Sequence, residues 1–379
     1  MRAYAIALTI CAHLARLEPS WDRWVYAFWL GGGVDLFFAI SGFVITRSLL
    51  DLKRRTARPS ILSIIKPFWI RRIYRLWPAA ICWAFASVIL SIFFNRLGLF
   101  GTVEGTLTFA LAGIGQFANL YGAVCSAPNA THPCEFSSLA VYWSLSLEEQ
   151  FYLLAPFALL FLPRKFFVLL LILIAGSQLF LTRDWPSALW FFRTDALCFG
   201  VLIGLTSEKT AIIRVAHSIL DRKILRATLV GALLIALIGV ASPGVVPFYN
   251  GAIALIAAAL VFIASFDRDY IVQSNLLKRV TNWLGARSFS LYLTHLLAFF
   301  AARELYARLR TMSVEGPVQI SSVVAIAILL TIVLTEFSYR VIEVPCRNKG
   351  RRRAERMLTA DAEGDQPRRE RAVADAARQ

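Results

Sequence analysis

Residues 31–50 read GGGVDLFFAISGFVITRSLL, a run of twenty residues in which Asp35 and Arg47 carry the only charges. An α-helix needs about 20 predominantly apolar residues to cross the hydrocarbon core of a bilayer. Blocks of the same kind recur along the chain at 3–17, 76–96, 147–162, 165–182, 193–206, 226–242, 247–266, 288–307 and 319–341. The sequence therefore predicts an all-α, polytopic membrane protein, a bundle of about ten transmembrane helices.

The composition favours one membrane-embedded domain. Of 379 residues, 58% are hydrophobic and 17% are charged, whereas about a quarter of the residues of a soluble domain are charged. We expect the membrane domain to cover 1–346. The remaining residues, 347–379, are expected to form a basic, disordered cytoplasmic tail, because they have little to bury. The first apolar block lacks a small-residue cleavage site, so we interpret it as a membrane helix rather than a signal peptide.

The formal net charge is +16, and its distribution sets the topology. Lys and Arg lie between the apolar blocks rather than in a soluble basic domain, which argues against a nucleic-acid partner. With the N-terminus in the cytoplasm, most basic loops fall inside, as the positive-inside rule requires, and the C-terminus is also cytoplasmic. Counting the glycine-interrupted stretch 105–122 as a span would break this pattern. We therefore expect it to be a surface or re-entrant helix.

The six cysteines include no CxxC pair, so we predict no metal site. Cys125 and Cys134 flank a polar stretch, 126–133. The sequence leaves open whether these two cysteines form a disulfide, which would require a loop outside the cytoplasm.

The first apolar block contains two ionisable residues, Arg2 and His13. Their spacing of eleven residues is close to three helical turns, so both side chains share one face, about 16 Å apart along the axis. Ionisable groups inside a membrane are costly and indicate function by default. The alternative is a snorkelling Arg and a hydrogen-bonded core His, but two such groups on one face favour function.

The next two blocks add four candidates. Asp35 lies near the outer end of its helix, whereas Ser41 is mid-span and better explained as part of a small-residue packing patch. Arg72 and Arg75 share a helix face at the membrane edge. Guanidinium groups suit phosphates, although a basic cluster that only sets topology is the alternative.

Further polar residues occur within or beside later blocks. Glu148 and Glu149 open an apolar helix and could cap it, bind a sugar or assist proton transfer. Arg193 and Asp195 open another block in a similar way, and the alternative to a functional role there is an ion pair between them. A packed core residue is the favoured interpretation of His295.

The candidate residues are expected at two depths in the membrane. The acids and His13 lie in the outer half, whereas Arg2, Arg72 and Arg75 lie at the inner face. This arrangement suits a reaction between a polyanionic donor inside and a hydroxyl acceptor outside.

Several segments together resemble the acyltransferase family 3 membrane proteins, which O-acylate cell-surface glycans, lipopolysaccharide and some small molecules. The resembling segments are Arg2-x10-His13, GGGVDLFFAISGFVITR (31–47), RRIYRLWP (71–78), WSLSLEEQFYLLAP (143–156), RTDALCFG (193–200), SFSLYLTH (288–295) and IEVPCR (342–347). They occur in consistent order over essentially the whole membrane domain.

The resemblance implies ten helices in a bacterial inner membrane and acyl-coenzyme A, commonly acetyl-CoA, as donor. It also implies an essential His matched by His13, an essential Arg matched by Arg2, and an inner-face R-x-x-R motif matched by Arg72 and Arg75. Members usually carry residues before the equivalent of Arg2. Some also have an appended extracytoplasmic hydrolase-like domain, so this chain is expected to act alone or with a separate envelope partner protein.

The sequence thus predicts a membrane O-acyltransferase that moves an acetyl or other short acyl group from acyl-CoA to a carbohydrate hydroxyl. His13 is the general base or a transient acyl carrier, and Asp35 or Glu149 orients or assists it. Arg2, Arg72 and Arg75 hold donor phosphates. Acceptor-binding or supporting roles are assigned to Ser41, Trp143, Glu148, Arg193, Asp195 and His295. The alternatives are a glycan or lipid transporter or flippase and a non-catalytic scaffold.

Overall fold

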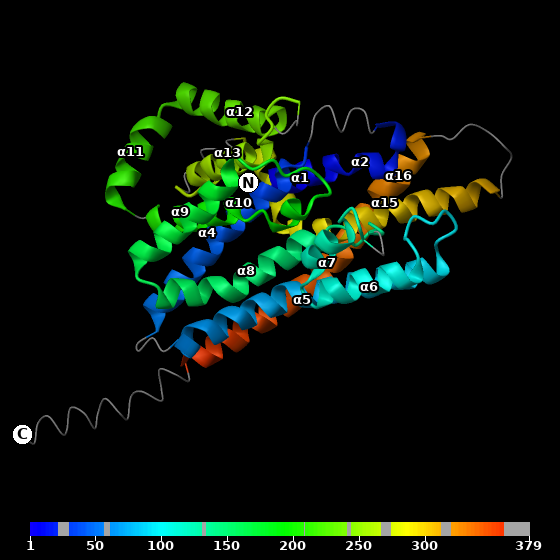
Figure 1. Ribbon diagram of the computed structural model, residues 1–379, viewed down its shortest axis with the longest axis horizontal. Coiled ribbons are helices and arrows are strands. Elements are labelled where there is room, and N and C mark those ends of the chain that lie inside the picture. The colour runs from blue at the N-terminus through cyan, green and yellow to red at the C-terminus, as the bar shows by residue number, and fades with distance from the viewer. Residues whose placement is uncertain are drawn as a thin grey trace, which may run out of the picture.

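The computed structural model describes residues 1–21, 30–56, 61–130, 134–207, 209–240, 244–266, 274–311 and 320–359. Within these ranges the chain forms helices and loops without a β-strand, which confirms the all-α prediction (Figure 1). The elements are α1 (Arg2–Ala12), α2 (Leu14–Leu17), η1 (Pro19–Trp21), α4 (Gly32–Arg55), α5 (Ile61–Phe93), α6 (Val103–Ile114), α7 (Ala118–Cys125), α8 (Tyr142–Phe161), α9 (Arg164–Leu179), η2 (Ala188–Phe192), α10 (Asp195–Thr206), α11 (Thr210–Leu220), α12 (Lys223–Gly239), α13 (Tyr249–Ala264), α14 (Asn275–Ala286), α15 (Ser288–Thr311), α16 (Ile320–Phe337) and η3 (Ser338–Glu343).

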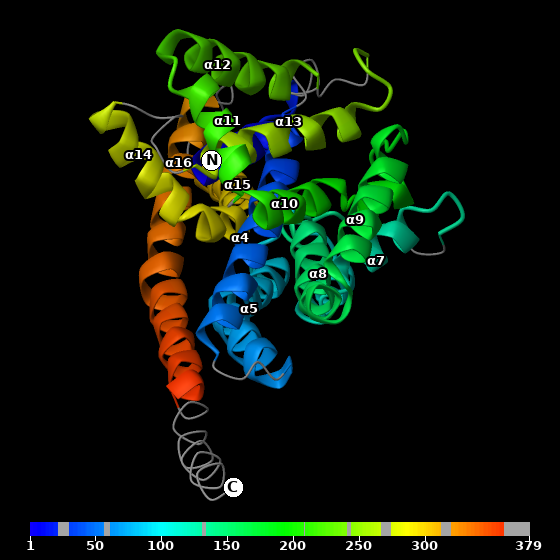
Figure 2. The same cartoon turned by 90° about the vertical axis from the view of Figure 1, so that its left-hand side faces the viewer.

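Helix α4 lies at the centre of the bundle, where it packs against α1, α5, α8, α10 and α13. Figure 2 shows it between α16 on one side and α8 and α9 on the other. Helices α11 and α12 lie at the periphery (Figures 1 and 2). Because α4 carries Asp35 and Ser41, its central position brings these residues close to several other helices.

Four helical stretches in the described part of the chain are long and apolar enough to cross a membrane: Gly32–Arg55, Ile61–Phe93, Ala188–Thr206 and Ile320–Thr359. Helices also occupy the other apolar blocks. Helices α8 and α15 are of comparable length, 20 and 24 residues, but they contain acidic or basic residues that lower their mean hydropathy.

The first apolar block, expected as one helix over 3–17, is interrupted at His13. The His13 backbone N–H donates to the carbonyl of Ile10 at 3.1 Å. The imidazole Nδ1 lies 2.9 Å from the Thr9 carbonyl, which would otherwise accept the i→i−4 backbone bond. The side chain has therefore replaced a helical hydrogen bond, which is how polar side chains commonly interrupt helices.

The stretch 105–122 forms parts of two helices, α6 and α7, rather than one. The chain turns at Gln116, whose φ is +63°, a left-handed conformation that a continuous α-helix of L-residues does not contain. The Thr102 hydroxyl accepts from the Gly105 N–H and caps the start of α6.

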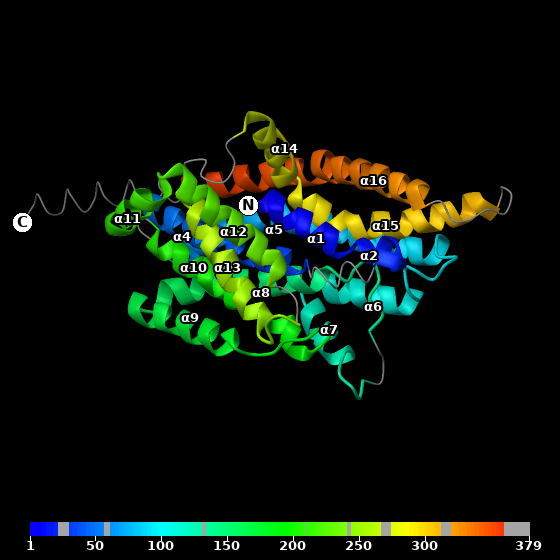
Figure 3. The same cartoon turned by 90° about the horizontal axis from the view of Figure 1, so that it is seen from above.

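The prediction of a disordered tail is wrong for residues 347–359, because the helix that begins with α16 continues to Thr359. Figure 3 shows this long helix running along one side of the molecule. Ala354 is fully buried, and Gly350 lies so close to Tyr74 that a Cβ atom there would be 2.5 Å from the Tyr74 Cβ. Contact with α5 thus gives this polar segment something to bury. Residues 360–379 lie outside the described residues.

Helices α4 and α10 cross with their backbones in contact. A Cβ atom on Gly42 would lie 2.2 Å from the Leu197 carbonyl oxygen, and one on Gly200 would lie 2.1 Å from the Ala39 carbonyl oxygen. Only glycine fits at both positions, and small residues commonly permit such close approach between membrane helices. The small-residue packing patch predicted around Ser41 is therefore present at its neighbour, Gly42.

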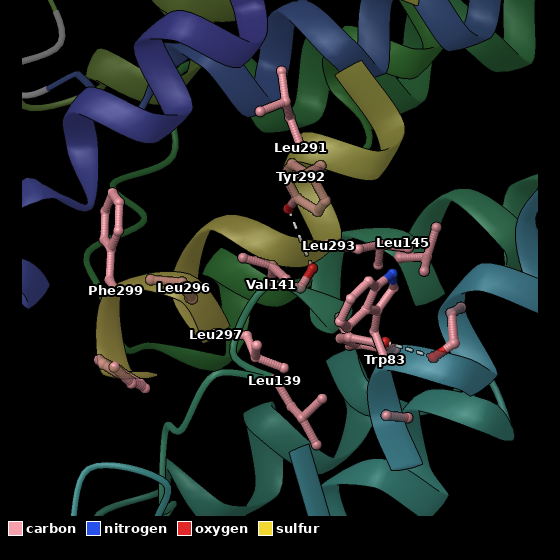
Figure 4. Packing of buried hydrophobic residues seen from close by; sticks show 14 of the residues in the cluster. Trp83, Leu139, Val141, Leu145, Leu291, Tyr292, Leu293, Leu296, Leu297 and Phe299 are labelled. Atoms are coloured by element: carbon pink, nitrogen blue, oxygen red, sulfur yellow. Dashed lines mark hydrogen bonds between the residues drawn. The ribbon is translucent and has the colours of Figure 1, made fainter. Parts of the chain in front are cut away.

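A hydrophobic cluster joins α5, the start of α8 and α15. It includes Trp83, Leu139 and Phe299 (Figure 4). In the same cluster the Tyr292 hydroxyl donates to the Val141 carbonyl at 3.2 Å, drawn as a dashed line in Figure 4. This packing fixes α15, which carries His295, against the beginning of α8.

Candidate active site

A cavity of about 70 Å³ lies between α1, α4, α5, α8 and α15. At about 10–15 Å³ per water by this measure, it has room for several water molecules or a thin chain of atoms. Its wall is partly aromatic and aliphatic, and its charged side chains are Arg2, Arg72, Arg75 and Glu148. The sequence placed these four residues on three separate segments, and the fold brings them to one cavity.

The charge in this cavity is unbalanced, with three guanidinium groups facing one carboxylate. Arg72 lies over the rings of Phe68 and Tyr152, at 5.6 and 5.1 Å from their centroids. Among the described residues, none of Arg2, Arg72 and Arg75 forms an ion pair with an acidic side chain. Because partly buried like charges repel one another, the binding of an anion in the cavity would be electrostatically favourable.

Glu148 is the carboxylate of the cavity. It accepts hydrogen bonds from the Ser41 hydroxyl at 2.8 Å and from the Tyr152 hydroxyl at 2.9 Å. Ser41 therefore does more than allow close packing, which was its favoured interpretation. It also orients an acidic group beside the three arginines.

Glu149 has a different environment. One carboxylate oxygen lies 3.4 Å from the indole N–H of Trp77, and the residue does not line the cavity. Consecutive residues of a helix point about 100° apart, so only one of the two glutamates can face the cavity. The structure gives that position to Glu148, whereas the assisting role was predicted for Asp35 or Glu149.

His13 lies beside His295. His13 Nδ1 and His295 Nε2 are 3.1 Å apart, and His295 Nδ1 is 3.0 Å from the Leu291 carbonyl oxygen. His295 is fully buried. The packed-core interpretation of His295 is thus incomplete, because its ring contacts the predicted catalytic histidine.

Tyr292 and Ser144 connect the histidine pair to the cavity. The Tyr292 ring centroid is 6.1 Å from that of His295 and 5.9 Å from that of Phe37, which lines the cavity. The Tyr292 hydroxyl is hydrogen-bonded to Ser144, and both residues also line the cavity. Neither was singled out from the sequence, although the three-residue spacing of Tyr292 and His295 places them on one helix face.

The ion pairs at the start of α10 differ from a pair between Arg193 and Asp195. Arg193 Nη1 lies 3.3 Å from Asp35 Oδ2, and Asp195 is paired with Arg183, whose Nη2 is 2.6 Å from Asp195 Oδ2. The structural alternative, an ion pair between Arg193 and Asp195, is therefore wrong. Arg183 follows an apolar block in the sequence and was missed, since nothing in the loop indicates its partner.

Asp35, Arg193 and Trp143 form a structural cluster rather than part of the cavity wall. The Arg193 guanidinium carbon lies 5.1 Å from the Trp143 ring centroid and 3.8 Å from that of Trp190. Its Nη1 also donates to the Asn250 side chain at 2.8 Å. The described residues show no hydrogen bond or ion pair between Asp35 and His13. These contacts connect α4, α8, η2 and α13, where buried charge is tolerated because it is paired.

The question left open for the cysteines has an answer in the structure. Cys125 and Cys134 are joined by a disulfide, with their Cα atoms 4.9 Å apart. The bond links the end of α7 to the segment that leads into α8. It thereby restrains the loop on which this pair of helices turns.

Comparison with known proteins decides the family. The sequence model of an acyltransferase domain matches residues 1–336. The chain belongs to acyltransferase family 3. This confirms the family resemblance, whose segments from Arg2 to His295 lie within the match, and with it the assignment to the transferases. No solved structure matches the chain.

Three bacterial relatives illustrate the similarity, each matching 92% of this chain. A putative peptidoglycan O-acetyltransferase of Bacillus subtilis is 29% identical over 374 residues, which are 54% of its length. The O-acetyltransferase OatA of Staphylococcus aureus is 28% identical over 379 residues and 57% of its length. The peptidoglycan O-acetyltransferase OatA of Listeria monocytogenes is 26% identical over 370 residues and 55% of its length. The chain therefore spans just over half the length of these relatives.

Proposed function

We propose that this protein is an integral membrane O-acyltransferase that moves an acetyl or other short acyl group from acyl-CoA to a hydroxyl group of a cell-surface glycan. The observation that carries the proposal is a cavity whose wall carries three arginines without an ion-pair partner in the described part of the chain. Ser144 and Tyr292 link this cavity to the His13–His295 pair. Membership of an acyltransferase family supports the reaction class.

Arg2, Arg72 and Arg75 bind the donor in this proposal. Coenzyme A carries a pyrophosphate and a ribose phosphate at one end and the thioester at the other end of a thin chain. Guanidinium groups form charge-assisted, often bidentate hydrogen bonds with phosphates. The phosphates would neutralise the excess positive charge, while the narrow cavity accepts the chain that leads toward Tyr292.

His13 acts on the acceptor. As general base it removes the proton of the acceptor hydroxyl, whose oxygen then attacks the thioester carbonyl carbon, and the coenzyme A thiolate leaves. As a transient acyl carrier His13 attacks the thioester carbonyl carbon itself and the coenzyme A thiolate leaves. The acceptor oxygen then takes the acyl group from the imidazole, and the acceptor proton passes to the thiolate. In either case we now assign the assisting role to Glu148, since it lines the cavity, and a positioning role to Asp35, which holds Arg193.

Peptidoglycan is the acceptor that we infer, and the names of the relatives from Bacillus subtilis and Listeria monocytogenes support it. The proposed site lies in the bacterial inner membrane, and the acyl group reaches the outer side there. A separate envelope protein could complete the transfer to the polymer. The names of all three relatives describe O-acetyltransferases, which favours the enzyme over the transporter or flippase.

Ten transmembrane helices with both termini in the cytoplasm form part of the proposal. Two amphipathic helices support the orientation, α11 and α14. In α14 the apolar residues Leu276, Leu277 and Val280 are 73%, 54% and 49% exposed, while Lys278 and Arg279 lie between them in sequence. A helix with this pattern suits the membrane surface, and its basic residues suit the cytoplasmic side.

Substitution of His13 tests the proposed function. We expect His13→Ala to lower the rate of acetyl transfer roughly 10²-fold, which is the usual contribution of a general base. The loss should be larger if His13 is the nucleophile. The assay follows labelled acetyl-CoA and soluble peptidoglycan fragments with the purified full-length chain in nanodiscs. His217→Ala, on the peripheral helix α11, is the matched control and should retain activity.

The same preparation separates the enzyme from its alternative. If His13→Ala inserts normally and transfers acetyl groups at the wild-type rate, the proposed role of His13 is wrong. The transporter alternative is tested with the same purified protein reconstituted in closed vesicles. Movement of a labelled glycan across the vesicle membrane without any acetyl-CoA turnover would favour a transporter.

A further inference from the structure

The contacts of the two histidine rings define which nitrogen of each ring carries the proton. The Leu291 carbonyl oxygen lies 3.0 Å from His295 Nδ1, and the Thr9 carbonyl oxygen lies 2.9 Å from His13 Nδ1. A carbonyl oxygen can only accept a hydrogen bond, so both Nδ1 atoms must be protonated. The opposite assignment would place a nitrogen lone pair against an oxygen lone pair at both sites.

With its Nδ1 protonated, a neutral His295 has an unprotonated Nε2, and this atom faces the N–H of His13 at 3.1 Å. The His13 Nδ1–H is then shared between two acceptors, the Thr9 carbonyl and His295. The consequence for His13 is that its Nε2 has a free lone pair and is the only basic atom of the ring.

We propose that His295 is a positioning residue that, together with the Thr9 carbonyl, holds His13 in the Nδ1–H tautomer and fixes its ring orientation, with His13 Nε2 as the reactive nitrogen. This inference rests on the proposed function. It holds whether His13 acts as base or as acyl carrier, because both roles use a nitrogen lone pair aimed at the substrate. His295 itself does not touch substrate.

The proton balance of the base route shows what His295 contributes. The acceptor O–H bond breaks and an N–H bond forms at His13 Nε2, which makes His13 an imidazolium cation. Its Nδ1–H still points at two acceptors, and the hydrogen bond to His295 becomes charge-assisted and stronger. His13 Nε2 then delivers the proton to the departing thiolate sulfur, and both rings return to the neutral state.

The surroundings of His295 suit a rigid support. The ring lies between Tyr292 and Phe299, at centroid distances of 6.1 and 6.0 Å, and it is fully buried. A carboxylate at this place would add a permanent buried charge, which is expensive inside a membrane. A neutral imidazole provides the acceptor without that charge.

Three substitutions of His295 separate positioning from packing. In His295→Gln the amide oxygen can reach the place of Nε2 and accept from His13. In His295→Asn the amide can replace the Nδ1 contact to Leu291 but does not reach His13. His295→Leu keeps an apolar volume and provides neither contact.

We expect His295→Asn and His295→Leu to lower kcat for acetyl transfer roughly 10²-fold, comparable to losing the help of a general base, with the KM for acetyl-CoA unchanged. His295→Gln should restore kcat to within about tenfold of the wild type. The measurement uses full-length protein in nanodiscs, with size-exclusion profiles and apparent Tm to confirm that each variant is folded.

Two results would overturn the inference. One is a wild-type kcat in His295→Asn, and the other is an equal loss in all three folded variants, because packing alone would then explain the effect. If His13→Ala abolishes transfer while the His295 variants retain it, only the positioning role fails. If His13→Ala itself retains transfer, the proposed function of His13 fails first.

Discussion

Arg75 shows how a single side chain connects burial with ligand binding. It lines the cavity with Arg2 and Arg72. Its Nε is buried and has no hydrogen-bond partner among the described residues. Such a group is costly unless a ligand satisfies it.

We predict that Arg75→Gln raises the KM for acetyl-CoA about tenfold, since one charge-assisted hydrogen bond contributes about 1.5 kcal/mol or more. The effect on kcat should be smaller, because the phosphates are remote from the reacting carbon. Steady-state kinetics at several acetyl-CoA concentrations measure both constants.

Arg351→Gln is the control for this experiment. Arg351 pairs with Glu355 on a largely exposed helix face, with side chains 68% and 56% exposed, and such pairs contribute little. An unchanged KM in Arg75→Gln, or the same increase in Arg351→Gln, would show that the cavity arginines do not hold the donor.

At the scale of single residues, the sequence predicted the group of arginines but not which carboxylates lie beside them. Arg2, Arg72 and Arg75 were predicted as one basic group, because ionisable residues at helical spacing near a membrane are uncommon. The choice between Glu148 and Glu149 depends on the rotation of α8 about its axis, which packing sets. The partner of Arg193 depends on which helix lies beside it, and local sequence does not specify that.

Where α4 and α10 cross, their backbones lie so close together that a larger side chain has no room. We predict that Gly200→Val destabilises the protein by about 1–3 kcal/mol or more, because the new side chain meets the Ala39 carbonyl and a packed interface tolerates extra atoms poorly. The apparent Tm in detergent, followed by tryptophan fluorescence or size-exclusion chromatography, should fall.

Gly231→Ala provides the matched comparison. Gly231 also lies within a helix, but a Cβ atom there would meet nothing within 4 Å. Alanine favours helix over glycine by about 1 kcal/mol, so its apparent Tm should be equal or higher. A Gly200→Val protein that is as stable as Gly231→Ala would contradict the backbone contact.

Helix positions were easier to predict than helix ends. Long apolar blocks such as 31–50 correspond to helices because hydrophobicity and length leave few other conformations in a bilayer. The interruption at His13 arose from a side chain that took over a backbone acceptor. The continuation to Thr359 arose from contact between Gly350 and α5. Both depend on tertiary neighbours, which a single sequence does not show.

At the scale of the whole molecule the orientation in the membrane is testable. The proposed topology places the C-terminus in the cytoplasm. We therefore predict that a green fluorescent protein fused after Gln379 is fluorescent and that alkaline phosphatase at the same position is inactive. Inserted between Cys125 and Cys134, alkaline phosphatase should be active, since the loop faces outward in the ten-span arrangement.

An active alkaline phosphatase at the C-terminus would contradict the proposed topology. Comparable expression of each fusion, checked by immunoblot, is the control for this comparison. The result also bears on the disulfide of that loop, because such bonds form and persist outside the reducing cytoplasm.

The excess of positive charge in the cavity also affects how the isolated protein behaves. Inorganic phosphate and sulfate offer guanidinium groups the same oxygen acceptors as a donor phosphate. Either ion in a purification buffer would compete with acetyl-CoA, so the apparent donor affinity should fall as its concentration rises. Coenzyme A should protect the protein against heat, since a ligand that binds only the folded state stabilises it. Buffer choice thus becomes a variable in any measurement of this enzyme's donor preference.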